Sequence, residues 1–310
     1  MDILFMGTPD FAAVSLKKLA LSKHNIIAVF TQPDKTVGRK MVLTSPAVKK
    51  AAEELNIPVY QPATLRTNDA CELIKNLNPE LIVVAAYGKI LPPEILAIPK
   101  FGCMNVHASL LPKYRGASPI QWSIVSGDTV TGVTTMQMNE GLDTGDILLT
   151  AEEEIKPEDT AADLFDRLAL KGAALALKTV DAIENGTLNP VKQDENDASY
   201  APIITKQMAE IDFSKTAREI DCLIRGFNPW PVAFTVLASG KKLKVFSAQI
   251  GENTTAEPGT VLCCKKELII ACGGGTSIKF DTVQLDGKAK MPASDLLNGL
   301  RLTKGEKINA

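Results

Sequence analysis

The sequence predicts an α/β fold, in which a Rossmann-like, mostly parallel sheet is followed by a C-terminal OB-like β-barrel domain. Three observations support this prediction. Short apolar runs alternate with helical patterns in the first part of the chain, a polar stretch without periodicity follows, and short strand-like runs punctuated by glycines fill the remainder.

The first part of the chain begins with a βα unit. A buried strand at 2–6 leads through the turn Gly7–Asp10 into a helix at 11–21, whose apolar residues recur at helical spacing. Alternation of this kind predicts parallel strands covered by helices. Later strands are predicted at 26–30, 57–60, 81–87, 103–107 and 132–138, and helices from Ser45, from about Pro119 and over 159–185.

The second part of the chain is separated from the first by a polar linker. We expect a domain at 1–188, a linker at 189–207 and a second domain at 208–310, because the linker has no sustained periodicity. Five short strands after a helix favour a small barrel. That helix is predicted at 214–226, and the strands at 233–237, 243–250, 259–264, 268–272 and 277–285.

Composition excludes several classes of protein. Hydrophobic residues make up 45% and charged residues 23% of the 310 residues, which argues against a disordered chain. The longest apolar run, Leu81–Tyr87, is far shorter than the ~20 residues of a membrane span. Six scattered cysteines and two histidines make a metal site improbable and indicate reduced thiols. We therefore expect a cytoplasmic protein without a metal.

Charge is divided unevenly along the chain. Residues 206–310 hold 15 Lys and Arg against 11 Asp and Glu, a balance of +4, whereas residues 1–205 hold 19 against 25, a balance of −6. A basic C-terminal domain suits contact with phosphates, although lysines also solvate strand edges. The lysines concerned are Lys241, Lys242, Lys244, Lys265 and Lys266.

Three polar residues at strand ends could support chemistry. Asn105 and His107 alternate along a strand, so their side chains point to the same side, and Asp143 follows the next strand in a glycine-containing turn. The amide could stabilise an oxyanion, the imidazole could move a proton, and the carboxylate could orient the imidazole. A structural histidine and an Asx-turn aspartate are the plainer alternatives.

Other chemistries lack their usual motifs. The turn Gly7–Asp10 lies where a dinucleotide fingerprint would, but it has no G-x-G-x-x-G, and the chain contains no P-loop. Ser109 is not in a G-x-S-x-G elbow, so we expect direct transfer without an acyl-enzyme.

These motifs together resemble the methionyl-tRNA formyltransferase family, within the folate-dependent formyltransferases. The resemblance spans nearly the whole chain and is carried by 5–12, 32–34, 86–91, 105–112, 115–116, 141–145, 227–231 and 258–262. It implies transfer of a formyl group from 10-formyltetrahydrofolate to the methionine of initiator methionyl-tRNA, with Asn105, His107 and Asp143 as the catalytic residues.

The resemblance also implies two binding regions. A cleft between 86–91 and 109–112 would receive the folate, with Tyr87, Gly88, Ile90, Ser109, Leu110, Leu111 and Pro112 as its residues. The loop Lys35–Thr44 and the C-terminal domain would contact the tRNA, with Lys35, Arg39, Lys40, Lys206, Lys241, Lys242 and Lys244 as candidates. We expect a monomer.

Three alternatives remain at this point. A formyltransferase acting on an amino-sugar nucleotide and a formyltetrahydrofolate hydrolase would use the same three residues. A non-catalytic tRNA-binding protein would explain the basic domain but would give Asn105, His107 and Asp143 no purpose.

Overall fold

The computed structural model describes residues 1–37, 41–300 and 302–308 and divides into two compact units. Arg39 and Lys40, two of the predicted tRNA contacts, lie outside the described residues. Unit 1 comprises Met1–Pro119, Val130–Glu154 and Phe165–Ala201, and unit 2 comprises Ile120–Thr129, Ile155–Leu164 and Pro202–Ala310. The C-terminal compact unit thus includes two segments from earlier in the chain.

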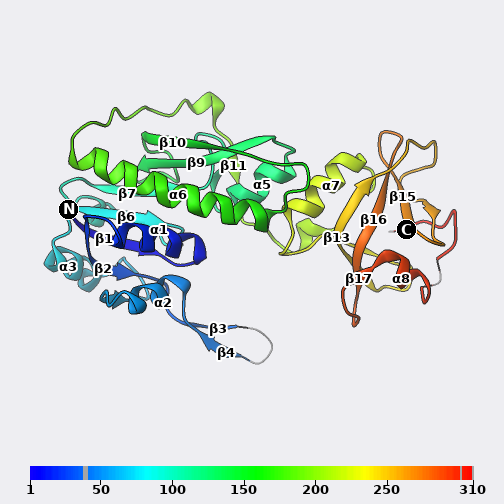
Figure 1. Cartoon of the computed structure of the whole chain (residues 1–310), viewed down its shortest axis with the longest axis horizontal. Coiled ribbons are helices and arrows are strands. Elements are labelled where there is room, and N and C mark those ends of the chain that lie inside the picture. Colours follow the sequence, from blue (N-terminus) through cyan, green and yellow to red (C-terminus); the bar gives the residue numbers. More distant parts are fainter. Residues whose placement is uncertain (38–40, 301, 309–310) are drawn as a thin grey trace. The chain divides into compact units, whose positions relative to one another are not determined.

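Unit 1 is built on a seven-stranded sheet in the order β10-β9-β7-β6-β1-β2-β5 (Figure 1). The first five strands along the chain in this sheet pair in parallel, while β9 is antiparallel to β7 and to β10, so the predicted mostly parallel sheet is confirmed. The strands are β1 (Asp2–Gly7), β2 (Asn25–Phe30), β5 (Val59–Tyr60), β6 (Leu81–Ala85), β7 (Cys103–His107), β9 (Val130–Gln137) and β10 (Ile147–Glu154).

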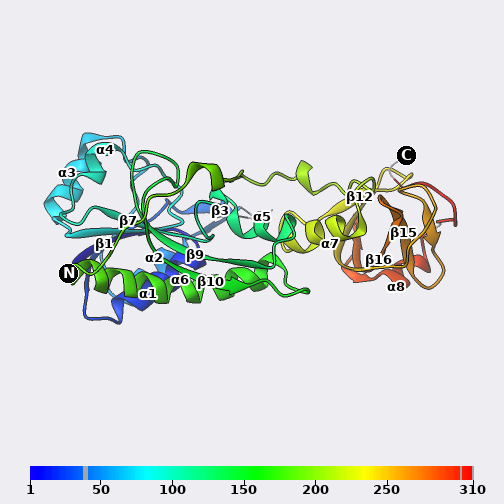
Figure 2. The same ribbon diagram turned by 90° about the horizontal axis from the view of Figure 1, so that it is seen from above.

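Helices cover both faces of this sheet (Figures 1 and 2). On one face lie α1 (Asp10–Ala20) and α6 (Ala161–Glu184), whose rings Phe11 and Phe165 are 5.8 Å apart. On the other face α3 and α4 pack Ile74 and Ile95 against buried strand residues. The bounds of α3 and α4 are Asn68–Leu77 and Pro93–Leu96, and α2 (Ala47–Glu54) packs beside α1. Helix α5 (Pro119–Val125) lies in unit 2 from Ile120 onward.

Several elements of unit 1 were not predicted. The predicted tRNA-contacting loop forms a hairpin of β3 (Lys35–Val37) and β4 (Val42–Thr44). A small parallel pair joins β8 (Arg115–Gly116) to β11 (Tyr200–Ala201), and β11 lies within the stretch expected to be a linker. The predicted strand at 81–87 ends at Ala85, because Ala86 and Gly88 adopt positive φ angles of 44° and 76° and turn the chain away from the sheet.

Unit 2 contains an antiparallel sheet in the order β12-β13-β16-β15-β14, with β17 paired to β16. Its core includes Leu243, Ile270 and Phe280. The elements are η2 (Gln207–Ala209), α7 (Ala217–Gly226), β12 (Phe234–Val236), β13 (Lys242–Ile250), β14 (Val261–Cys263), β15 (Leu268–Cys272), β16 (Thr276–Leu285), β17 (Met291–Pro292) and α8 (Ala293–Leu297).

A C-terminal antiparallel β domain is therefore confirmed, but closure into a barrel is not. Over the described residues the path of paired strands ends at β12 on one side and at β14 on the other. Among those same residues, no helix is both long and apolar enough to cross a membrane.

Candidate active site

The three predicted catalytic residues meet at the carboxyl end of β7. Asn105 and His107 lie on β7, and Asp143 lies in the turn between β9 and β10. The Asn105 Nδ2 atom is 3.4 Å from Asp143 Oδ1, and His107 Nδ1 is 3.6 Å from Asp143 Oδ2. His107 and Asp143 are both buried. The carboxylate of Asp143 thus lies beside an amide and an imidazole that are 36 or more positions away along the chain.

The turn that carries Asp143 has a constrained backbone. Asp143 has a positive φ of 53°, a left-handed conformation that aspartate adopts more readily than most residues. Its Oδ2 atom accepts a hydrogen bond of 2.8 Å from the backbone N–H of Gly116. A Cβ atom at Gly145 would lie 1.6 Å from the Gln137 carbonyl oxygen, so only glycine fits there.

Both ring nitrogens of His107 face hydrogen-bond acceptors. Nε2 is 2.9 Å from the Tyr114 carbonyl oxygen, which can only accept, so this nitrogen carries a proton. Nδ1 faces the Asp143 carboxylate at a distance longer than a hydrogen bond. A second proton on Nδ1 would therefore point either at Asp143 or at a substrate oxygen beside the carboxylate.

Three residues form a hydrogen-bonded network beside this turn, and sequence reasoning did not predict that role for any of them. Gln193 donates from Nε2 to the carbonyl oxygens of Asp143 and Gly145, at 2.9 and 2.7 Å. The guanidinium of Arg115 bonds Gln193 Oε1 and both carboxylate oxygens of Glu195. The sequence identifies Arg115-Gly116 only as part of a motif. Nothing in the local sequence links Arg115 to Gln193 and Glu195, which lie about 80 positions later.

The predicted folate residues differ in their surroundings. Tyr87, Ser109 and Leu111 are buried, and the Ser109 hydroxyl donates to the Lys113 carbonyl. Leu110 is half-buried beside Gly132 of β9. The segment 109–112 thus packs into the protein, and it leaves mainly backbone groups for a ligand.

A cavity of about 460 Å³ in unit 1 lies at the end of the segment 86–91, the other segment of the predicted folate region. Ile90, which is 69% exposed, lines it, and so does Glu140 from the turn that carries Asp143. The further lining residues are Leu65, Arg66, Thr67, Asn68, Cys71, Leu91, Pro92, Pro93, Glu94 and Ile95. Gly88 lies nearby in sequence, but neither it nor 109–112 lines this cavity.

The candidate tRNA contacts that the structure describes are mostly exposed. Lys35 lies on β3, Lys206 precedes η2, Lys241 directly precedes β13, and Lys242 is the first residue of β13. Lys244 is half-buried on β13. The ammonium of Lys242 is 4.0 Å from the centre of the Phe234 ring, a cation–π contact that holds this side chain against the sheet.

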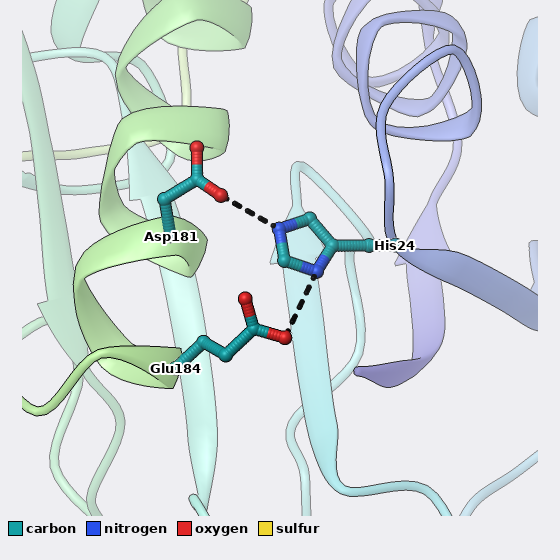
Figure 3. A group of neighbouring side chains, drawn as sticks. All are labelled: His24, Asp181 and Glu184. Carbon is teal, nitrogen blue, oxygen red and sulfur yellow. Dashed lines mark hydrogen bonds and ion pairs between the residues drawn. The ribbon is translucent and has the colours of Figure 1, made fainter.

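One group of side chains in the described ranges has the composition of a metal site. His24, Asp181 and Glu184 offer ligand atoms within 4.8 Å of one another, and Figure 3 shows the imidazole between the two carboxylates. Lys23 Nζ is 3.3 Å from Asp181 and 2.6 Å from Glu184, and its hydrogen bond lowers the pKa of the Glu184 carboxyl. The lysine already supplies the counter-charge, so the group is an ion-pair network.

Comparisons with known proteins agree with the resemblance seen in the sequence. Residues 1–180 match the family described as formyl transferase, and residues 203–301 match its C-terminal domain. A methionyl-tRNA formyltransferase from Alkaliphilus oremlandii is 47% identical over 306 residues, covering 98% of each chain. Another from Geobacter metallireducens is 45% identical and covers 99% of this chain and 98% of its own.

Solved structures share the fold at lower identity. The N-formyltransferase from Helicobacter canadensis, crystallised with folinic acid and dTDP-3-aminofucose, is 22% identical. It covers 90% of this chain and 98% of its own, with a TM-score of 0.68.

Proposed function

The chain belongs to the methionyl-tRNA formyltransferase family, and from this premise we propose that Asn105, His107 and Asp143 carry out the transfer. The reaction moves a formyl group from 10-formyltetrahydrofolate to the amino group of methionine on initiator methionyl-tRNA. The amino-sugar enzymes share the fold at 22% identity, whereas the methionyl-tRNA enzymes share nearly half of all residues along the full length.

The geometry of the three residues supports this mechanism. The neutral methionyl amine attacks the formyl carbon, which forms the new C–N bond and turns the formyl oxygen into an oxyanion. Asn105 Nδ2 and a protonated His107 Nδ1 are the donors to that oxygen. Both now face Asp143 at 3.4 and 3.6 Å, distances long enough for a substrate oxygen to replace the carboxylate as their acceptor.

Collapse of the tetrahedral species breaks the bond between the formyl carbon and N10 of the folate. N10 leaves with its electron pair and takes up a proton, and the attacking nitrogen loses one, so the products are formyl-methionyl-tRNA and tetrahydrofolate. Asp143 orients His107 during this transfer, while the Tyr114 carbonyl fixes the other side of the ring.

Binding of the two substrates is assigned to separate regions. We propose that the folate uses the cavity at Ile90 together with Tyr87, Gly88 and the backbone of 109–112. The hairpin 35–44, Lys206 and the lysines of β13 are proposed to contact the tRNA. Their positive charge supports this, because phosphate contacts dominate the affinity of such interfaces.

The same proposal covers the organisation of the chain. We propose that 1–188 is the catalytic domain, 189–207 the linker and 208–310 an OB-like tRNA-binding domain, and that the protein acts as a monomer. The antiparallel order of the sheet in unit 2 and the basic balance of residues 206–310 favour this assignment. The molecular mass measured by sedimentation in the absence of tRNA tests whether the protein is a monomer.

The meeting of Asn105, His107 and Asp143 carries the proposal, and single substitutions test it. Removal of one oxyanion donor typically lowers turnover about 100- to 1000-fold, so Asn105→Ala and His107→Ala should lose at least that much kcat. Folate affinity, measured by titration, should stay near that of the wild type. A His107→Ala enzyme that kept more than roughly a tenth of the activity would exclude His107 from the mechanism.

A further inference from the structure

The segment that follows α6 returns to the turn that carries Asp143. Gln193, on this segment, has a half-buried side chain whose amide hydrogens bond two carbonyl oxygens of the turn, at Asp143 and Gly145. A primary amide has two N–H donors, so this pair of contacts uses both of them. The backbone on either side of Thr144 is thereby tied to a single side chain.

Gln193 is itself fixed by a buried arginine. Its Oε1 atom accepts a hydrogen bond of 3.0 Å from Arg115 Nε. The two terminal nitrogens of Arg115 bond the two oxygens of Glu195, both at 2.9 Å, in a bidentate pair that leaves the arginine 8% exposed. The orientation of the Gln193 amide is therefore determined from both ends.

The short strand that contains Arg115 also holds the Asp143 side chain. Arg115 and Gly116 form β8, and the Gly116 N–H donates to Asp143 Oδ2. Backbone and carboxylate of Asp143 are thus held by two arms of one network, through Gln193 and through Gly116. Such support suits a residue with a positive φ, a conformation that the aspartate would not keep by itself.

We propose that Gln193 is a positioning residue for formyl transfer: it fixes the backbone at Asp143 and Gly145 so that the carboxylate faces His107, and Arg115 with Glu195 fixes Gln193. The inference rests on the proposed roles of His107 and Asp143. Gln193 touches neither substrate in this assignment and acts only through the turn.

Two substitutions separate this role from simple anchoring of the segment. Gln193→Ala removes both the hydrogen bonds to the turn and the acceptor for Arg115. Gln193→Glu keeps an acceptor for Arg115 but loses the N–H donors, and it directs a negative charge at two carbonyl oxygens. We expect both variants to lose kcat by roughly 10- to 100-fold, because a displacement of about 1 Å at a reacting group can cost about 100-fold.

The KM for methionyl-tRNA should stay within about threefold of the wild type in both variants, since the tRNA contacts are untouched. Lys192→Ala, an exposed neighbour on the same segment, is the matched control and should keep wild-type kcat. Melting temperatures of all three should lie within about 2 °C of the wild type, which excludes unfolding as the cause.

Wild-type kcat in Gln193→Glu would overturn the inference, because the variant would then show that the bonds to the turn are dispensable. A loss of kcat that also appears in Lys192→Ala would overturn it as well. A failure of the proposed roles of His107 and Asp143 is distinguishable, since His107→Ala would then keep its activity whatever the Gln193 variants do.

Discussion

The hydroxyl of Tyr87 is a buried donor in the region assigned to the folate. Among the described residues it has no hydrogen-bond partner, and burial raises the pKa of Tyr87 to about 12, so the phenol stays protonated at neutral pH. An unpaired buried donor costs the free protein free energy, and a ligand acceptor that reached the hydroxyl would remove that cost.

We therefore predict that Tyr87→Phe weakens folate binding without destabilising the protein. Loss of a hydrogen bond to the ligand corresponds to about 0.5–1.5 kcal/mol, or roughly 2- to 13-fold in Kd. Calorimetric titration with a folate and thermal unfolding measure the two effects. Unchanged affinity together with a lower melting temperature would place the hydroxyl outside the folate site.

The thiols differ in their ionisation. Burial raises the pKa values of Cys103 and Cys272 to about 12, whereas backbone N–H groups, that of Lys265 first, lower the pKa of the Cys263 thiol. At pH 8 a thiol with a pKa of about 12 is ionised in roughly one molecule in ten thousand.

In the native protein at pH 8, iodoacetamide should consequently modify Cys263 well before Cys103 or Cys272. Peptide mapping by mass spectrometry at successive times gives the order, and the same reaction in denaturant should remove the difference. Equal rates in the native protein would contradict the burial of Cys103 and Cys272.

At the residue scale, the sequence predicted groups whose neighbours are local and missed those tied by distant contacts. Asn105 and His107 could be placed together because a strand alternates its side chains. Gln193 could not be found, because its bond to Asp143 spans 50 positions and follows only from the path of the chain after α6. The burial of the Ser109 and Leu111 side chains likewise follows from tertiary packing, and their assignment to the folate stays a prediction.

At the scale of elements, apolar runs predicted the central strands and the edge strand β5, but they did not predict the other edge strand, β10. β10 ends in Glu152–Glu154, which gives no sign of burial, yet Glu153 pairs with Arg167 and Lys171 of α6 and so belongs to the packed structure. The β3–β4 hairpin escaped prediction because its residues are exposed and no periodic pattern marks them.

One carboxylate fixes the base of that hairpin. Asp34 accepts hydrogen bonds from Gln61, Lys49 and Ser45, and these bonds, that of Gln61 first, lower the pKa of the Asp34 carboxyl. The group is therefore ionised throughout the neutral range. The stability it contributes is present above the pKa of an unfolded aspartate and is lost only as the pH falls through the lower folded value.

Asp34→Asn should therefore loosen the hairpin 35–44 without affecting the folate site. We expect faster proteolysis within the hairpin and a severalfold rise in the KM for methionyl-tRNA, with folate affinity unchanged. Glu53→Gln on α2 is the matched control. If Asp34→Asn matched that control in proteolysis and KM, the carboxylate would have no part in presenting the hairpin to tRNA.

At the scale of the whole molecule, the uneven charge distribution assigns different tasks to the two parts of the chain. The balance of +4 for residues 206–310 contrasts with −6 for residues 1–205, which include all three proposed catalytic residues. Because a polyanion is repelled by net negative charge, the salt-dependent share of tRNA affinity should come mainly from the C-terminal part.

Lys241, Lys242 and Lys244 test this division. Each lysine that neutralises a phosphate contributes about one unit to the slope of log affinity against log salt, so replacing all three by glutamine should weaken binding and flatten that slope by up to about three units. A triple variant of unit 1, Lys18→Gln with Lys50→Gln and Lys178→Gln, changes the net charge equally at exposed positions. Affinities for methionyl-tRNA measured across a salt series separate local contacts from net charge. If the β13 triple variant and the control gave the same slope, these lysines would only solvate a strand edge, and this face of unit 2 would not bind tRNA.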